Sequence, residues 1–275
     1  MRCRCSLYKF KETIHNPYLT CTFYLKKIRG GTLKAALQVA AFALNAGLYA
    51  AFGYIFFYIF PLTTPGLGLV RFWPQVIIPA VFAVIFGPWV GGFGAAFGIF
   101  ISDMLIHGNP ILSLMAGVTS NFAGFWLIGY IANKNMDWKI PMLGFGIISV
   151  LLAWIALTIL STDAVIYAGI IIVNYVILLI VVWLTPKWRS YEVGSMIGLL
   201  IGSVIIGTMV PVFSQFFIMP GGTELTPLAV SAGFAYLIWT FATEIPFLIV
   251  LGPPILEACY KAYPSLKPPS NKESN

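Results

Sequence analysis

The sequence predicts an all-α, polytopic transmembrane helical bundle. Of its 275 residues, 59% are hydrophobic and only 9% are charged, and the mean hydropathy of +0.90 lies far outside the range of soluble globular domains. Long apolar runs recur along the chain, and several reach the roughly 20 residues that a helix needs to cross the hydrocarbon core. The alternating pattern of a membrane-spanning β-barrel is not found. We therefore expect about eight spanning helices.

Proline, glycine and short polar segments separate the apolar runs, and these breaks define the expected boundaries. We expect spans at residues 33–60, 71–86, 88–106, 110–132, 140–160, 163–185, 191–212 and 227–252. A tail at 1–30 then precedes a transmembrane domain at 31–258, and a second tail occupies 259–275. The first span, about 42 Å long at about 1.5 Å per residue, exceeds the thickness of a bilayer core, so it must tilt or protrude.

The distribution of lysine and arginine predicts that both termini face the cytoplasm. The positive-inside rule counts basic residues in short loops and near helix ends. With a cytoplasmic amino terminus, the basic residues of the two tails and of the later inner breaks fall on one side, and Arg71 is the single exception. The net charge of +7 then needs no nucleic-acid site. Arg71 opens the second span, where it either snorkels to the headgroups or faces an anionic ligand.

The first span carries alanines at helical spacing. Ala36 and Ala40 form an AxxxA motif with Ala43 nearby, and Ala46 with Ala50 repeats the spacing. Small residues at this spacing allow transmembrane helices to approach closely. Because alanine is common in helices, the motif alone is a weak signal.

The third span begins in a glycine-rich stretch, "FGPWVGGFGAAFGIFISD". A phosphate-binding loop would require a following lysine or a water-exposed helix start, and neither follows. On a helix that begins at Pro88, Gly91, Gly94 and Gly98 fall on one stripe, so we expect them to pack against neighbouring helices. The Gly87-Pro88 break leaves almost no loop, which predicts a hairpin of the second and third spans with a cytoplasmic tip.

Polar side chains within the hydrocarbon are costly, and they usually face a cavity or a partner. Asp103 and His107 share a face at the outer end of the third span, where they form either an interfacial polar cap or part of a ligand site. Asn121 and Asn174 lie near mid-membrane and either hydrogen-bond a neighbouring helix or contact a solute. Glu244 precedes a proline in the last span, and it either bonds a neighbouring helix or handles a proton or a substrate.

No sequence pattern supports catalysis. HExxH, GxSxG, CxxC and P-loop motifs are absent, and two histidines leave few acid–base groups. Cys3, Cys5, Cys21 and His15 match no standard zinc spacing, so we expect no metal site. We therefore expect no enzyme, no catalytic residue and no bound cofactor. Polar groups without catalytic clustering suit solute binding better.

The hairpin "RFWPQVIIPAVFAVIFGPWVGGFGAAFGIFISDML" at 71–105 resembles the membrane substrate-binding subunits, or S components, of energy-coupling factor (ECF) transporters. The shared features are a proline-containing second helix, a GPxxG turn at Gly87, Pro88 and Gly91, and a small-residue third helix that ends near an aspartate. The resemblance is good over 33–132, general beyond, and absent for 1–30. S components usually have six spans. Eight spans thus imply either two additional helices or two misdivided or re-entrant segments around a six-span core.

The resemblance implies a passive subunit that captures a vitamin or similar micronutrient at a prokaryotic cell membrane. The loop "PLTTPGLGLVR" at 61–71 would cover the solute. The implied solute contacts are Arg71, Asp103, His107 and Asn121.

The resemblance also implies partners. Ala36, Ala40 and Ala43 would dock on a transmembrane coupling protein that works with two cytoplasmic ATPases, which agrees with the absence of a nucleotide motif here. The alternative is a stand-alone secondary transporter in which Asp103 or Glu244 carries a coupling proton, although no internal repeat supports it. The sequence does not identify the substrate.

Overall fold

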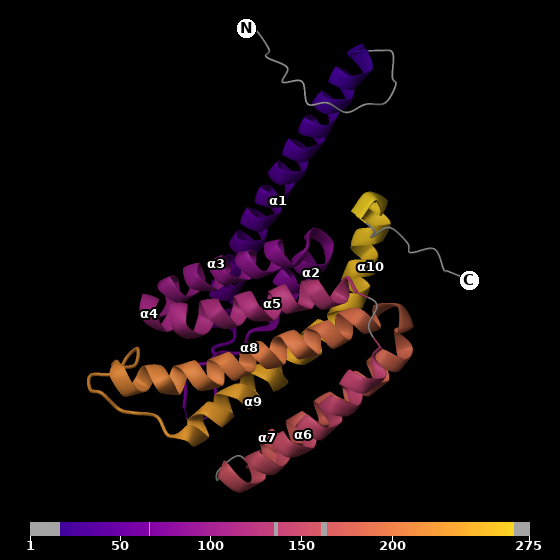
Figure 1. Ribbon diagram of the computed structural model, residues 1–275. Helices are drawn as coiled ribbons and strands as arrows, with labels where there is room; N and C mark the ends of the chain where they lie inside the picture. Colours follow the sequence, from indigo (N-terminus) through magenta and orange to yellow (C-terminus); the bar gives the residue numbers. More distant parts are fainter. Residues whose placement is uncertain (1–16, 66, 135–136, 161–163, 267–275) are drawn as a thin grey trace, which may run out of the picture. The chain divides into compact units, whose positions relative to one another are not determined.

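The computed structural model describes residues 17–65, 67–134, 137–160 and 164–266 (Figure 1), and it describes side chains from residue 35 onward. The chain divides into two units, Met1–Val39 and Ala40–Asn275. Helix α1 (Pro17–Ile59) contributes residues to both. It begins within the segment expected to be a cytoplasmic tail. Cys3, Cys5 and His15, considered above for metal binding, lie outside the described residues.

The unit from Ala40 onward consists of helices joined by short connections. The α-helices after α1 are α2 (Ile77–Phe86), α3 (Pro88–Ile106), α4 (Pro110–Leu112), α5 (Thr119–Ala132), α6 (Lys139–Ile159), α7 (Ala164–Leu184), α8 (Arg189–Phe216), α9 (Val230–Pro246) and α10 (Gly252–Ala262). Three 3₁₀ turns, η1 (Pro74–Val76), η3 (Pro186–Trp188) and η5 (Pro264–Leu266), and two π-helical segments, η2 (Ser113–Val118) and η4 (Phe247–Leu251), complete the described elements.

The fold class predicted from the sequence is confirmed. The described residues are 84% helical and contain no strand. Seven described helices are long and apolar enough to cross a membrane. The remaining one of the eight expected spans, at 71–86, is helical only over Pro74–Phe86 and is shorter than the other seven. The last span runs from Val230 to Ala262 rather than ending at 252, because α10 continues the helix beyond Gly252.

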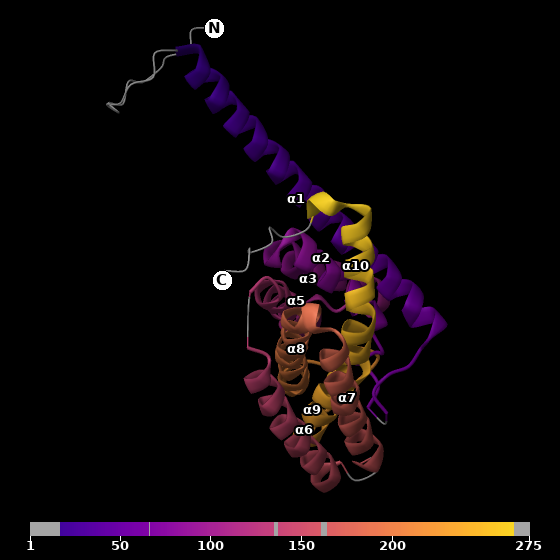
Figure 2. The same cartoon turned by 90° about the vertical axis from the view of Figure 1, so that its right-hand side faces the viewer.

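Close glycine contacts hold the centre of the bundle together. Helix α5 lies between α3 and α8 in both views (Figures 1 and 2). A Cβ atom placed on Gly124 of α5 would lie 3.0 Å from the carbonyl oxygen of Gly198 on α8, so the two backbones touch. Gly194 and Gly202 flank Gly198 at four-residue spacing and also face α5. This GxxxGxxxG run is a helix-packing signal that the sequence analysis overlooked.

The stripe of Gly91, Gly94 and Gly98 on α3 lies against two neighbouring helices. A Cβ on Gly91 would overlap Ala83 of α2, one on Gly94 would overlap Asn45 of α1, and one on Gly98 would lie 2.9 Å from the carbonyl oxygen of Ala46. The stripe therefore accommodates α2 at one end and α1 further along. These three glycines therefore lie at close helix contacts, as the packing role predicted from the sequence requires.

Helices α6 and α7 form a hairpin at the side of the bundle. They contact each other most extensively and then α9 (Figure 2). Asn174 of α7 donates a hydrogen bond from Nδ2 to the carbonyl oxygen of Ala242 on α9, over 2.8 Å. One of the two outcomes considered for Asn174, an interhelical hydrogen bond, is thereby confirmed.

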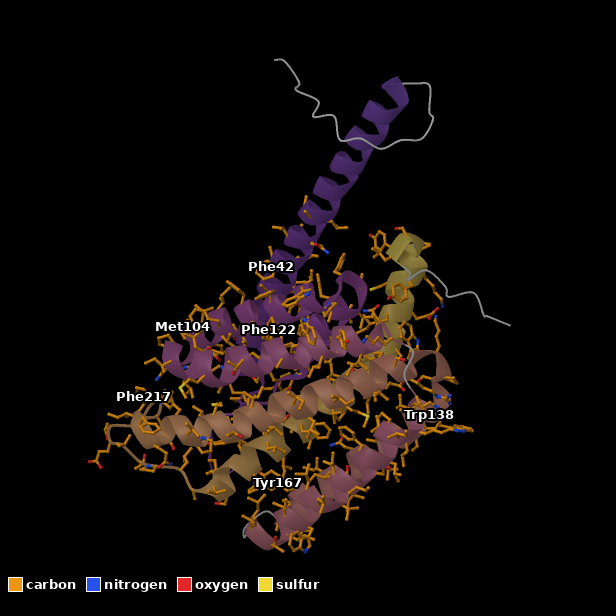
Figure 3. The ribbon with its side chains drawn as sticks, viewed as in Figure 1. Phe42, Met104, Phe122, Trp138, Tyr167 and Phe217 are labelled. Atoms are coloured by element: carbon orange, nitrogen blue, oxygen red, sulfur yellow. The ribbon has the colours of Figure 1, made fainter. Side chains whose placement is uncertain are left out.

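The two ends of the bundle differ in the residues they carry. Met104 and Phe217 lie at one end and Trp138 at the other (Figure 3). Asp103 is adjacent to Met104 in the chain, and the charge bias of the sequence predicts that this end faces outward. We call it the outer end below.

Candidate functional site

The outer end of the bundle contains a cavity of about 100 Å³. A single buried water needs roughly 10–15 Å³ on this measure, so the space admits several waters or a small solute. Its walls come from α1, α3, η2, α5, α8 and α9, and from the end of the loop that precedes η1. Arg71, Asp103, His107 and Asn121, the four residues expected to contact a solute, all line it, and so does Glu244.

Asp103 is the centre of the polar cluster. The carboxylate is buried, with 4% of the residue exposed, and it accepts hydrogen bonds from two side chains and contacts a third. Arg71 pairs with Oδ1, Ser113 donates to Oδ2 over 2.7 Å, and His107 Nε2 lies 3.4 Å from Oδ1. The interaction with His107 follows from their i,i+4 spacing on α3. A carboxylate with this many donors is held in a fixed orientation.

His107 is oriented by a hydrogen bond at Nδ1 and by a contact of Nε2 with Asp103. Its Nδ1 accepts from the backbone N–H of Asn109 over 3.1 Å, which places the proton of a neutral ring on Nε2, facing Asp103. The side-chain oxygen of Asn109 in turn accepts from the N–H of Leu112 over 3.0 Å, capping the next helix ahead of Pro110. The helix cap and the ion-pair cluster are therefore built from one short segment.

Arg71 reaches the cavity from the loop between α1 and η1. Its guanidinium carbon lies 4.7 Å from the ring centroid of Trp73, a cation–π arrangement. The loop doubles back on itself, with an antiparallel bridge between Thr63 and Arg71 and a 2.8 Å hydrogen bond from Thr64 N–H to the carbonyl of Val70. Nη2 of Arg71 pairs with Asp103, whereas the buried Nη1 has no hydrogen-bond partner among the described residues. The enclosed Nη1 of the guanidinium group thus keeps unused hydrogen-bonding capacity.

Asn121 links two walls of the cavity. Tyr49 of α1 donates its hydroxyl to Oδ1 of Asn121 over 2.7 Å, and Nδ2 of Asn121 donates to the carbonyl of Gly117 over 2.8 Å. The interhelical bond considered for Asn121 is confirmed. Gly117 belongs to the π-helical segment η2, a local widening that often accompanies functional sites in helices. Asn121 therefore combines a structural bond with a position in the cavity wall.

Glu244 lies at the deep end of the cavity. It also lines a smaller adjoining cavity of about 20 Å³ between α5 and α8. Only 6% of the residue is exposed, yet its carboxylate makes no hydrogen bond or ion pair within the described residues. The alternative that Glu244 bonds a neighbouring helix is thus not realised. Two residues later comes Pro246, directly before the π-helical turn η4.

Known proteins give no direct guide to this site. No family model, curated protein or solved structure matches the chain. Function must therefore be argued from the cavity and its surroundings. Among the described residues, no group of three or more His, Cys, Asp or Glu side chains is placed to hold a metal ion.

A wider hollow of about 700 Å³ lies outside the cavity and shares Leu69, Arg71 and His107 with it. One side is formed by the 67–71 segment, which belongs to the loop expected to cover the solute. The other side is formed by residues 219–228, between α8 and α9. The sequence analysis assigned no role to this second loop, although its length and its Pro220-Gly221 pair set it apart from the shorter breaks.

The two AxxxA pairs of α1 differ in their surroundings. Ala36, Ala40 and Ala43 are all exposed. Ala46 and Ala50 are buried, at 6% and 5% exposure. The sequence spacing is the same in both pairs, so only the structure distinguishes an outward-facing alanine surface from one used inside the bundle.

Proposed function

We propose that this protein is the membrane-embedded solute-capture subunit of an ECF-type micronutrient importer. The observation that carries the proposal is the cavity at the outer end, in which Arg71, Asp103, His107 and Asn121 converge next to the loop at 61–71. Ligand sites are typically concave and mostly apolar, with a few placed polar groups, and this cavity has that character. In this reading the polar cluster orients a vitamin-like solute that enters from the wider hollow.

The helix arrangement supports a six-helix core with an addition. The cavity and its surroundings use α1, α2, α3, α5, α8 and α9, whereas α6 and α7 form a hairpin that contacts mainly α9. Six helices match the usual number in S components, and the hairpin accounts for the two extra spans that the sequence predicts. The hairpin can then be present without altering the solute site.

The exposed alanines suit a docking role. Ala36, Ala40 and Ala43 present small side chains outward, and such surfaces allow helices of two proteins to approach closely. The chain carries no nucleotide-binding motif, so ATP hydrolysis in this proposal belongs to two partner ATPases that act through a transmembrane coupling protein. The location would be a prokaryotic cell membrane.

One observation favours a second candidate function. Glu244 is a buried, unpartnered carboxylate in contact with the cavity, and such groups mark proton relays in many transporters. A stand-alone secondary transporter that couples solute uptake to proton binding at Glu244 would use it in this way.

Transport in proteoliposomes separates the two candidates. The protein is reconstituted alone or with a coupling protein and its two ATPases, and the solute that co-purifies with it, identified by mass spectrometry, is supplied outside. Capture-subunit function predicts uptake only with the full module and ATP. Uptake by the protein alone, driven by a proton gradient, would refute it.

Docking is tested with bulky substitutions on the alanine surface. The double variant Ala36→Leu/Ala40→Leu should abolish module-dependent uptake while solute binding to the purified protein is retained. Ala258→Leu, an exposed alanine on α10, is the matched control and should leave both unchanged. Loss of solute binding in the double variant would argue against a docking surface.

A further inference from the structure

The charges that line the cavity do not balance. Arg71 and Asp103 pair with each other, so their two charges cancel, and His107 lies beside Asp103. Glu244 remains as a carboxylate without a partner among the described residues. An isolated carboxylate inside a membrane protein is costly, and the cost is relieved by a cation or by a proton.

The position of Glu244 points toward an occupant of the cavity rather than a neighbouring helix. It lines both the main cavity and the smaller one behind it, so its carboxylate borders empty space. The nearby amide of Asn121 is already engaged with Tyr49 and Gly117. No protein group is therefore in place to neutralise Glu244, whereas a bound solute would be.

The other walls favour an organic cation over a metal ion. The described residues offer no cluster of three or more metal-ligating side chains. The ring of Tyr49 lines the cavity, and aromatic rings attract organic cations, whereas the ring of Trp73 already holds Arg71. At the outer end, Arg71 also lines the cavity, and its Nη1 has no hydrogen-bond partner within the described residues.

We propose that the captured solute is a small organic cation whose positively charged nitrogen pairs with Glu244, while an acceptor group at its other end meets Arg71. This inference rests on the proposed capture function and specifies its substrate class. Glu244 is then a specificity-determining residue. It selects for positive charge, because a neutral analogue would leave its carboxylate unpaired.

Three molecules of nearly identical shape test the charge preference on the purified, full-length protein. Benzamidine is a cation, benzamide is neutral and benzoate is an anion. Their binding is measured by thermal shift and by isothermal titration calorimetry in detergent. We expect benzamidine to bind at least about tenfold more tightly than benzamide, the range for a hydrogen bond to a charged group, and benzoate to bind more weakly still.

The variant Glu244→Gln assigns the preference to this carboxylate. It keeps the side-chain shape, and we expect it to remove the advantage of benzamidine over benzamide while benzamide binding is retained. Glu257→Gln is the matched control, because Glu257 pairs with Lys187 at the surface of α10, away from the cavity, and should leave the advantage intact. Retained benzamide binding also reports that the variant is folded.

The outcomes separate this inference from the capture function. Equal or tighter binding of benzamide or benzoate to the wild type, no response to benzamidine, or an advantage that survives Glu244→Gln would each overturn the cation site. If the cation site is overturned but module-dependent uptake of a neutral or anionic solute is found, the capture function is retained without the cation site. Cation binding that depends on Glu244 without module-dependent uptake would instead keep the site and refute the importer.

Discussion

Replacing Asp103 by asparagine removes the charge at the centre of the polar cluster. The substitution keeps the size of the side chain but leaves the guanidinium of Arg71 without its ion-pair partner. The side chains of Arg71 and Asp103 are only 12% and 5% exposed, so water cannot readily take the place of the lost carboxylate. The pair is therefore expected to behave as a buried ion pair.

The expected loss follows from that burial. Breaking a buried pair by removing one partner costs about 3–5 kcal/mol, because an uncompensated charge remains in a poorly solvated place. The chain provides its own comparison in Lys187 and Glu257, whose side chains are 60% and 33% exposed. A pair of that exposure contributes about 0–1 kcal/mol, so Glu257→Gln should cost no more than that.

The free energy of unfolding is measured by titrating the detergent-solubilised protein with sodium dodecyl sulfate and following helicity by circular dichroism. Asp103→Asn should lower it by about 3–5 kcal/mol and Glu257→Gln by less than about 1 kcal/mol. A double variant, Arg71→Met/Asp103→Leu, should recover most of the loss, because buried pairs replaced by apolar residues are often neutral.

Two results would refute this reasoning. If Asp103→Asn costs no more than Glu257→Gln, then water screens the pair through the wider hollow and the cavity is an open, hydrated cleft. If the double variant is no more stable than Asp103→Asn, then the loss comes from Ser113 and His107 and not from the stranded charge of Arg71.

Three further predictions concern helix packing. Gly198→Ala should destabilise the protein by about 1–3 kcal/mol in the same unfolding assay, because its Cβ would overlap the α5 backbone. The control Gly144→Ala, which has open space at that position, should be neutral or slightly stabilising. If the two substitutions changed the free energy of unfolding equally, the close crossing of α5 and α8 would be contradicted. Asn174→Val should cost about 0.6–1.7 kcal/mol through loss of the bond to α9, and should speed hydrogen exchange in α7 measured by mass spectrometry; unchanged exchange would show that this bond does not hold the hairpin. Asn109→Ala should cost about 1 kcal/mol through loss of the helix cap, whereas Asn109→Asp, which retains an acceptor, should cost less.

Most of the helices could be predicted from hydropathy and from the proline, glycine and polar residues that separate the apolar runs. The third and fourth spans begin and end where the sequence places them, at Pro88, Ile106, Pro110 and Ala132, because proline or glycine marks the first three ends and the polar run at 133–139 marks the last. The last span was expected to end too early. Local sequence rules treat Gly252, Pro253 and Pro254 as a boundary, but the helix continues through them because the two prolines occupy the first turn of α10.

The site could be predicted only in part, for a physical reason. Asp103 and His107 share a helix face at fixed spacing, so their proximity follows from helix geometry. Their convergence with Arg71 and Glu244 depends on how distant helices and a loop pack, which no local pattern encodes. Tyr49 gave no signal at all, because a tyrosine in an apolar span resembles any other aromatic residue until its hydroxyl is seen to meet Asn121.

The crossing of α5 and α8 restricts how the cavity can open toward the inner side. At Gly124 and Gly198 the two backbones touch with no side chains between them, in the wall of the small cavity that Glu244 also lines. A gate that works by rotating a side chain on the picosecond to nanosecond timescale is therefore not possible at this point. If the protein captures and releases a solute as we propose, inward passage at this point requires one whole helix to move against the other, a collective motion on the microsecond to millisecond timescale, so release is expected to be slow and concerted.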